Sequence, residues 1–324
     1  MTLETEVLMD RRRLRRSVSF WRILTVVAAA LVLVVLGLKA NGDGALLGER
    51  KQIARVTIEG LITENREQLQ LLDRLAKAKH VPAVLLFINS PGGTTTGGEA
   101  LYEGIRRLSA QKPVIAQFGT VAASAAYICG LATDHIVARG NTITGSVGVI
   151  FQWAELTELL GKVGVKMHEI KSGPLKANPS PFQPLDPAGR ETAEKMVKES
   201  MVWFRGLVAE RRKIDTAGVP GLEQGRVYSG REALTHKLID EIGGEREAVS
   251  WLERERKIEK GLKVVDWKPK KDSDWSKLGL LGKAVGWLFG VDVGDLRFLN
   301  EDSRFGQLLL DGLVSVWQPV KNKQ

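Results

Sequence analysis

The chain has 324 residues, with 47 lysines and arginines against 38 aspartates and glutamates and a formal net charge of +9. This length allows one full hydrophobic core with extensions, and the single cysteine, Cys129, excludes an intrachain disulfide. The basic charge does not indicate nucleic-acid binding, because the arginines cluster ahead of an apolar segment and no basic-aromatic pattern occurs elsewhere.

The N-terminal region predicts a membrane anchor. Residues 1–22 contain the arginine cluster, and residues 23–38 form an apolar run that, with two preceding aromatic residues, approaches the length of a bilayer-spanning helix. Positive charge before the run predicts a cytoplasmic N-terminus and places the bulk of the chain across the membrane. A cleaved signal peptide is the alternative. Signal-peptide cleavage requires small residues at the cleavage site, and Lys39 falls at such a position. Ala40 could serve instead, but we favour an uncleaved anchor because of Lys39.

Strands and helices alternate after a short polar linker at residues 39–50. Apolar patterning predicts strands at residues 54–58, 83–88, 114–118, 135–138 and 147–151. Helical spacing predicts helices at residues 68–76, 99–108 and 186–213, with another beginning directly after Ser124. Near-continuous apolar strands separated by helices are typical of parallel pairing with helices packed outside. Residues 51–250 are therefore predicted to form one α/β core without an internal repeat.

The C-terminal part, residues 251–324, differs in character because it contains five of the eight tryptophans. Its apolar segment at residues 280–291 is too short to span a bilayer, and its apolar side chains fall on one helical face. This pattern predicts a helical extension. The helix could lie in the membrane interface or dock on the core or on a neighbouring subunit, and we favour docking.

Ser124 is the candidate nucleophile, because it lies among small residues between a predicted strand and a predicted helix. A serine at such a turn can be presented near a helix N-terminus. Upstream, Gly92 and Gly93 follow a predicted strand, where a glycine pair can aim backbone N–H groups at a developing oxyanion. Downstream, Lys176 lies in a Gly- and Pro-rich loop. Together these residues predict a serine hydrolase whose base is a lysine.

A hydrolase of this kind could instead use a histidine base or a metal centre. None of the four histidines lies in a motif, which argues against a Ser-His-Asp site; they are His80, His135, His168 and His236. A lysine serves as base when apolar surroundings favour its neutral amine, and Leu175 and Phe182 could supply them. No His, Cys or Asp cluster has metal-ligand spacing, so we expect neither metal nor other cofactor.

Five motifs in order make the chain resemble the S49 signal peptide peptidases, in their short, single-repeat form. They are Asn-Ser-Pro-Gly-Gly at 89–93, Val-Ala-Ala-Ser at 121–124, Thr-Gly-Ser-Val-Gly-Val-Ile at 144–150, Lys-Ser-Gly-Pro-Leu-Lys at 171–176 with Pro-Phe at 181–182, and Gly-Arg-Val-Tyr-Ser-Gly-Arg-Glu-Ala at 225–233. The resemblance covers residues 51–250. It implies a crotonase/ClpP-like fold, membrane attachment and hydrolysis of peptides in or near the membrane.

The resemblance also implies roles for individual residues. They are the nucleophile Ser124, its base Lys176, a serine that holds this base, Ser146, and the oxyanion-hole glycines Gly92 and Gly93. From the residues alone, Ser146 would be interpreted as a turn hydroxyl. One departure from the family pattern is that Ala125 and Ala126 follow the nucleophile where Gly-Gly is common, which can narrow the pocket but removes no catalytic group.

The resulting hypothesis is a single-pass serine endopeptidase of the bacterial inner membrane, with its catalytic domain outside the cytoplasm. Its expected partners are apolar peptides such as cleaved signal peptides, membrane lipid and further copies of the chain. The Pro-rich segment that bears Lys176 could cross a subunit boundary, or it could lie over its own site. The alternatives are a related Ser-Lys protease acting on membrane or envelope proteins, a crotonase-like acyl-CoA enzyme, and an inactive assembly scaffold.

Overall fold

The chain divides into two units, residues 1–50 and residues 51–324. The computed structural model describes residues 20–25, 27, 50–269 and 313–316. In the first unit the described residues before Arg50 are helical. The rest of the predicted anchor and linker, residues 26 and 28–49, lies outside the described residues. Among the described residues, no helix has both the length and the apolar character that crossing a bilayer requires.

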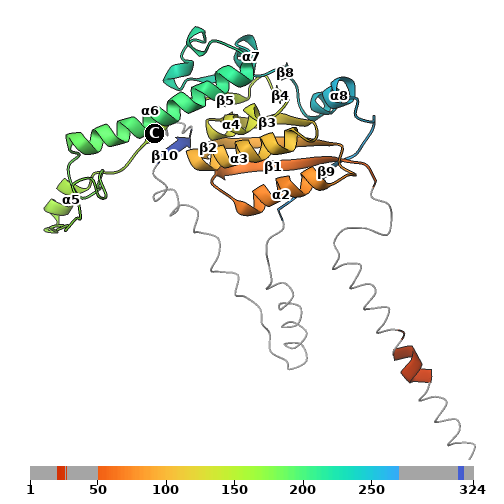
Figure 1. Ribbon diagram of the computed structural model, residues 1–324, viewed down its shortest axis with the longest axis horizontal. Helices are drawn as coiled ribbons and strands as arrows, with labels where there is room; N and C mark the ends of the chain where they lie inside the picture. The colour runs from red at the N-terminus through yellow and green to blue at the C-terminus, as the bar shows by residue number, and fades with distance from the viewer. Residues whose placement is uncertain (1–19, 26, 28–49, 270–312, 317–324) are drawn as a thin grey trace, which may run out of the picture. The chain divides into compact units, whose positions relative to one another are not determined.

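One sheet forms the centre of the described part of the second unit (Figure 1). Consecutive parallel neighbours are, in spatial order, β9 (Val264–Asp266), β1 (Ile53–Ile62), β2 (Ala83–Thr94), β3 (Val114–Ala123), β4 (His135–Ala138) and β8 (Glu241–Ile242). The others are β5 (Ile143–Gly145), β6 (Ile150–Phe151), β7 (Val227–Ser229) and β10 (Leu313–Val316). β5 pairs with the end of β3 and with β7, and β10 lies between β2 and β6.

Helices cover both faces of this sheet. Those on one face are α2 (Arg66–Lys77), α3 (Thr95–Ser109) and α4 (Ala125–Leu131), and α8 (Glu245–Glu255) packs on the other. Leu86 belongs to the core under α2–α4, whereas its neighbour Leu85 belongs to the core under α8. Successive side chains of a strand point to opposite faces of the sheet. Because helices cover both faces, the side chains on each face must be apolar. The predicted α/β core of near-continuous apolar strands is thereby confirmed.

The segment between β6 and β8 contains further helices of the described residues. They are α5 (Thr157–Lys162), α6 (Pro187–Arg212), two short 3₁₀ turns at Thr216–Gly218 and Leu222–Gln224, and α7 (Gly230–Thr235). The Asp186 carboxylate caps α6 by accepting a hydrogen bond from the Gly189 amide at 2.6 Å. Figure 1 shows α5 at the end of α6 that is farther from the sheet.

The strand predicted at residues 147–151 differs from the structure. β5 ends at Gly145, residues 146–149 are irregular, and only Ile150 and Phe151 form a strand. The physical reason is a local backbone reversal, because Gly145 and Ser146 have φ angles of 85° and 52°. Such values are incompatible with a continuing strand and uncommon outside glycine.

The sequence predicts a helical C-terminal extension, and the described residues beyond α8 differ from that prediction. The boundary predicted after residue 250 falls inside α8. Beyond α8, residues 264–266 pair with β1 and residues 313–316 pair with β2 and β6, so the extension contributes two strands to the sheet. The helix predicted at residues 280–291 lies outside the described residues.

Candidate active site

Ser124 lies at the turn between β3 and α4, as the sequence predicts. Its backbone has φ 58° and ψ −122°, a strained conformation for a residue with a side chain. Two hydrogen bonds hold it: the Ser124 amide donates to the Gly145 carbonyl at 2.9 Å, and the Ser124 carbonyl accepts from the Ile128 amide at 3.0 Å. A strained strand-to-helix turn is the local geometry that aims a serine out of a sheet.

Small, fully buried residues surround this turn. They are Ala122, Ala123, Ala125 and Ala126. Packing under the turn is tight, because a Cβ added to Gly98 of α3 would lie 3.2 Å from the Ala125 Cβ. Cys129, on the same helix, is buried and its burial raises the pKa of the thiol to about 12. Cys129 is therefore a packing residue, because its thiol stays protonated and unreactive at neutral pH.

The two glycines predicted to form the oxyanion hole lie near the end of β2. Gly92 has φ 113°, which favours glycine, and a Cβ on Gly93 would overlap the Ile62 carbonyl of β1. The neighbouring Ser90 side chain is buried, and its Oγ accepts a hydrogen bond from the Gly92 amide at 3.1 Å. The sequence alone did not assign a role to Ser90, although it belongs to the Asn-Ser-Pro-Gly-Gly motif. Its contact fixes where the Gly92 amide points.

Asn89 is a second residue that the sequence did not single out. The pairing of β2 with β3 jumps from Ile88–Phe118 to Ser90–Ala122, so three residues of β3 lie opposite Asn89 alone. Its Oδ1 accepts from the amides of residues 120 and 121 at 3.0 and 3.2 Å. The side chain thus replaces the missing ladder partners of a bulge, and it fixes the path of β3 into Ser124. The position of Asn89 in the motif that precedes the glycine pair could have drawn attention to it. The bulge that it supports has no recognisable sequence pattern.

Ser146 lies next to the turn that carries Ser124, through its neighbour Gly145. β5 runs beside the end of β3, with Gly145 opposite Ala123. The half-buried Ser146 donates its amide to the Arg226 carbonyl at 2.9 Å, which holds the reversed backbone in place. Ser124, Ser146 and the two glycines are therefore all carried by the carboxyl ends of β3, β5 and β2.

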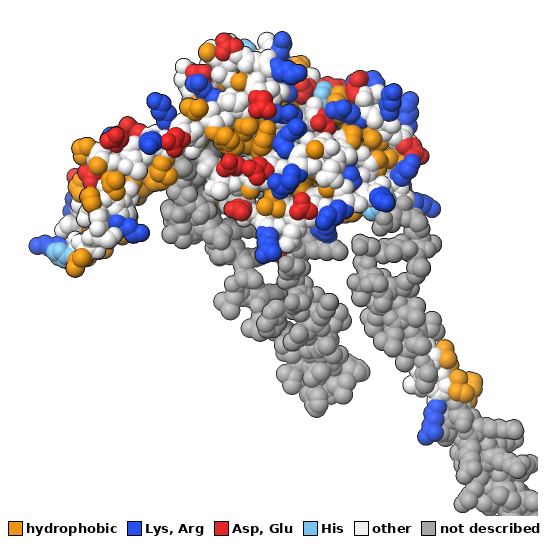
Figure 2. All heavy atoms as spheres, viewed as in Figure 1, with side chains coloured by type: hydrophobic (Ala, Val, Ile, Leu, Met, Phe, Trp, Pro, Cys, Tyr) orange, Lys and Arg blue, Asp and Glu red, His pale blue; other side chains and the backbone are white. Residues whose placement is uncertain are grey.

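Lys176 lies elsewhere, in an exposed turn between α5 and α6. Its amide donates to the Gly173 carbonyl at 3.1 Å. Leu175, expected to enclose the lysine, is 50% exposed within one chain. Other large apolar side chains of this segment are also exposed, namely Leu159, Val163, Val165, Met167 and Ile170. Figure 2 shows apolar side chains gathered on this projecting part of the surface. Such a patch commonly marks a contact surface.

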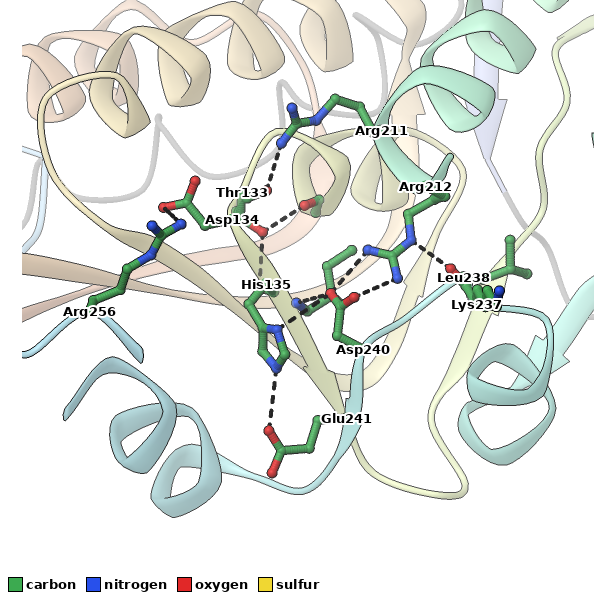
Figure 3. A network of polar contacts seen from close by, with 12 residues as sticks. Thr133, Asp134, His135, Arg211, Arg212, Lys237, Leu238, Asp240, Glu241 and Arg256 are labelled. Carbon is green, nitrogen blue, oxygen red and sulfur yellow. Dashed lines mark hydrogen bonds and ion pairs between the residues drawn. The ribbon is translucent and has the colours of Figure 1, made fainter. Parts of the chain in front are cut away.

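His135, the histidine with the most polar surroundings, lies at the wrong end of the sheet to serve Ser124. It opens β4, which runs parallel to β3, whereas Ser124 follows the last residue of β3. Its ring stacks on Trp251 at 4.5 Å, and its Nε2 lies 3.3 Å from Glu241 Oε2 (Figure 3). The neighbouring Asp240 is held by two hydrogen bonds from Arg212 at 2.7 and 3.0 Å. This network ties α6, β4, β8 and α8 together, a structural role.

The site geometry agrees with comparisons against known proteins. A model of peptidase family S49 matches residues 106–259, which include Ser124, Ser146 and Lys176, and a model of Clp protease matches residues 45–139. A Synechocystis protein named "Putative protease" is 35% identical over 203 residues, covering 62% of this chain and 73% of the relative. A Methanocaldococcus jannaschii protein with the same description is 30% identical, covering 72% and 78%.

Protease 4 of Haemophilus influenzae is 32% identical over 213 residues, which cover 63% of this chain but 34% of that longer relative. The match to Protease 4 therefore spans about a third of that relative. Together with the motifs carried by β2, β3 and β5, these matches establish that the chain is a member of peptidase family S49.

Proposed function

We propose that the protein is a serine endopeptidase in which Ser124 is the nucleophile and Lys176 the general base. The observation that carries this proposal is the strained turn at Ser124, hydrogen-bonded to Gly145 and adjacent to Ser146. Ser124 Oγ would attack the peptide carbonyl and transfer its proton to the neutral Lys176 amine. The same amine would then protonate the leaving group, and water would release the acyl group by the reverse sequence.

The glycine amides would stabilise the oxyanion that forms during this attack. The Gly92 amide donates to Ser90 Oγ in the present structure. As the oxyanion forms, this amide would exchange a neutral acceptor for a charged one, and charge-assisted hydrogen bonds are about twice as strong. Gly93 supplies the neighbouring amide. Ser146 would orient the Lys176 amine without adding a charge to the site.

We further infer that the complete site forms between copies of the chain. Lys176 is exposed within one chain, in a segment whose apolar side chains are also exposed. A second copy packed against this segment would bury those side chains and desolvate the lysine, the condition under which a lysine becomes a base at neutral pH. A ring of copies would also enclose the sites and restrict them to unfolded peptides.

The proposed substrates are apolar peptides, such as signal peptides left in the membrane after cleavage. The small residues around Ser124 support close approach of an extended peptide backbone. Residues 1–38 support attachment to the bacterial inner membrane with the catalytic domain outside the cytoplasm. A related protease acting on membrane or envelope proteins would use the same residues.

The direct test is hydrolysis of synthetic signal peptides by the full-length protein in detergent micelles, followed by mass spectrometry. The proposal predicts internal cleavage that is lost in the Ser124→Ala variant. A panel of acyl-CoA thioesters serves as the second substrate class. Turnover of thioesters without peptide cleavage would identify a crotonase-like enzyme, and absence of both would leave a scaffold.

A further inference from the structure

Strand β10 lies beside β2, the strand that carries the predicted oxyanion glycines (Figure 1). Residues 314, 315 and 316 pair antiparallel with Thr94, Gly93 and Gly92 of β2. On its other side, β10 pairs with Ile150 and Phe151 of β6. The segment therefore fills a slot between two strands that the rest of the chain leaves apart.

The position of this slot relative to Ser124 follows from the strand pairing. A strand has two hydrogen-bonding edges, and β1 takes one edge of Gly92 and Gly93 through residues 61 and 62. The other edge of β2 faces β3 as far as the pair Ser90–Ala122. Two residues after Ala122, the chain turns at Ser124 into α4. β3 therefore pairs with this edge of β2 only as far as Ser90, and β10 pairs with the same edge from Gly92 to Thr94.

A peptide cleaved by Ser124 would need this same edge. Extended peptides bind proteins by adding a strand to an open sheet edge, and main-chain hydrogen bonds supply much of the affinity. The slot would hold such a peptide beside the glycines of β2 and the nucleophile turn. The sequence in the slot, Leu-Val-Ser-Val, consists of small and apolar residues and has high strand propensity. It has the chemistry of the apolar peptides proposed as substrates.

We propose that residues 313–316 are an internal ligand of the peptide-binding slot and keep it closed until they are displaced. The identification of the slot as the substrate site rests on the proposed function, whereas the occupancy rests on the strand pairing. A tethered segment has an effective concentration of about 1 mM when its linker spans the distance. Free peptide would have to compete with that concentration, so occupancy of the slot by β10 would raise the apparent KM for peptide substrates.

The test weakens β10 without touching the catalytic residues. In a strand, the amides of consecutive residues point to opposite edges, so the double substitution Val314→Pro/Ser315→Pro removes one ladder hydrogen bond toward β2 and one toward β6. Ser315→Ala is the matched control, because it keeps the amide. With full-length protein and a fluorogenic apolar peptide below saturation, the proline variant should show about ten-fold higher kcat/KM with little change in kcat. The control should match the parent chain.

A binding measurement separates this proposal from the proposed function. In the Ser124→Ala background, a fluorescein-labelled peptide of residues 309–320 should bind the proline variant more tightly than the chain with an intact β10. If the proline variant binds the peptide more tightly but no chain that retains Ser124 hydrolyses peptides, the proposed function is overturned and the internal-ligand proposal is supported. Equal binding, or loss of both binding and activity in a folded proline variant, would overturn the internal ligand.

A second design does not depend on folding with prolines. A recognition sequence for a specific protease is inserted between residues 269 and 313, and the purified, folded protein is cut there and diluted. Cutting converts the tethered segment into a dilute free peptide, so peptide hydrolysis and binding of the labelled peptide should both increase. If neither changes although β10 has been released from the protein, as judged by mass, the internal ligand is contradicted.

Discussion

The amide of Ser124 donates a hydrogen bond to the carbonyl of Gly145 at 2.9 Å, and this contact joins the turn at Ser124 to the segment that carries Ser146. It connects the end of β3 with the end of β5, two strands that already pair at Ala123 and Gly145. Because both ends of the contact have positive φ angles, each reversed backbone supports the other. This contact between the two segments is made by main-chain atoms, which Ser124→Ala and Ser146→Ala both retain.

Loss of either member of the proposed dyad should abolish activity. Ser124→Ala and Lys176→Ala should each lower kcat by roughly 10³-fold or more, because neither attack nor proton transfer has a substitute. Groups that act as a unit are not additive, so the double variant should be little worse than either single variant. Peptide hydrolysis with circular dichroism as the folding control provides the measurement. A single variant with near-normal turnover would refute the assignment.

Ser146→Ala should lower kcat more than it changes KM. One buried orienting hydrogen bond contributes about 1–3 kcal/mol, and the loss should therefore be roughly 10–100-fold, smaller than for Ser124→Ala. Ser229→Ala is a suitable control, since Ser229 Oγ accepts a hydrogen bond from the Glu232 amide at the start of α7 and is exposed. The control should lose some stability but no activity. An unchanged rate and pH profile for Ser146→Ala would make Ser146 a turn residue only.

Asn89→Ala should misplace the nucleophile turn, because two amides of β3 lose their shared acceptor. We expect a stability loss of about 1–3 kcal/mol and a lower kcat, with KM less affected. Asn89→Asp is the matched variant, since a carboxylate oxygen can accept from the same two amides. Recovery of kcat by Asn89→Asp supports the positioning role. Equal kcat in Asn89→Ala and the parent, after correction for the folded fraction, would exclude it.

Complementation decides whether Lys176 serves its own chain or a neighbour. The inactive Ser124→Ala and Lys176→Ala proteins are mixed under conditions that exchange subunits. If the site forms between copies, about a quarter of the junctions in an equal mixture regain both groups, and activity returns. If mass measurements demonstrate exchange and the mixture stays inactive, each site is built within one chain.

Much of the fold follows from the sequence, because its strands are apolar on both faces. Residues such as Leu85 and Leu86 serve different cores, and continuous apolar runs therefore mark the buried parallel strands. The positive φ angles at Gly145 and Ser146 were not predictable from apolar patterning, which reads residues 147–151 as one strand. The four-residue run at β10 was also missed, since a short apolar run has no distinctive period and its partner strands are distant in sequence.

The candidate site divides in a similar way. The sequence predicts that Ser124 follows a strand and begins a helix, and the structure places it there. It cannot predict the bulge opposite Asn89, which depends on the register between two strands. Nor does it predict the exposure of Lys176, because apolar neighbours in sequence enclose a side chain only if the loop folds back on them or another copy covers it.

The most direct test of the central claim is labelling by a fluorophosphonate, which modifies only activated serine nucleophiles. The full-length protein in detergent is treated with the probe, digested and mapped by mass spectrometry. The account predicts one modified peptide with the label on Ser124, and strongly reduced labelling in Lys176→Ala, which lacks the base that activates the serine. Labelling at another residue, or at Ser124 with the same rate in both chains, would contradict the assignment of the dyad.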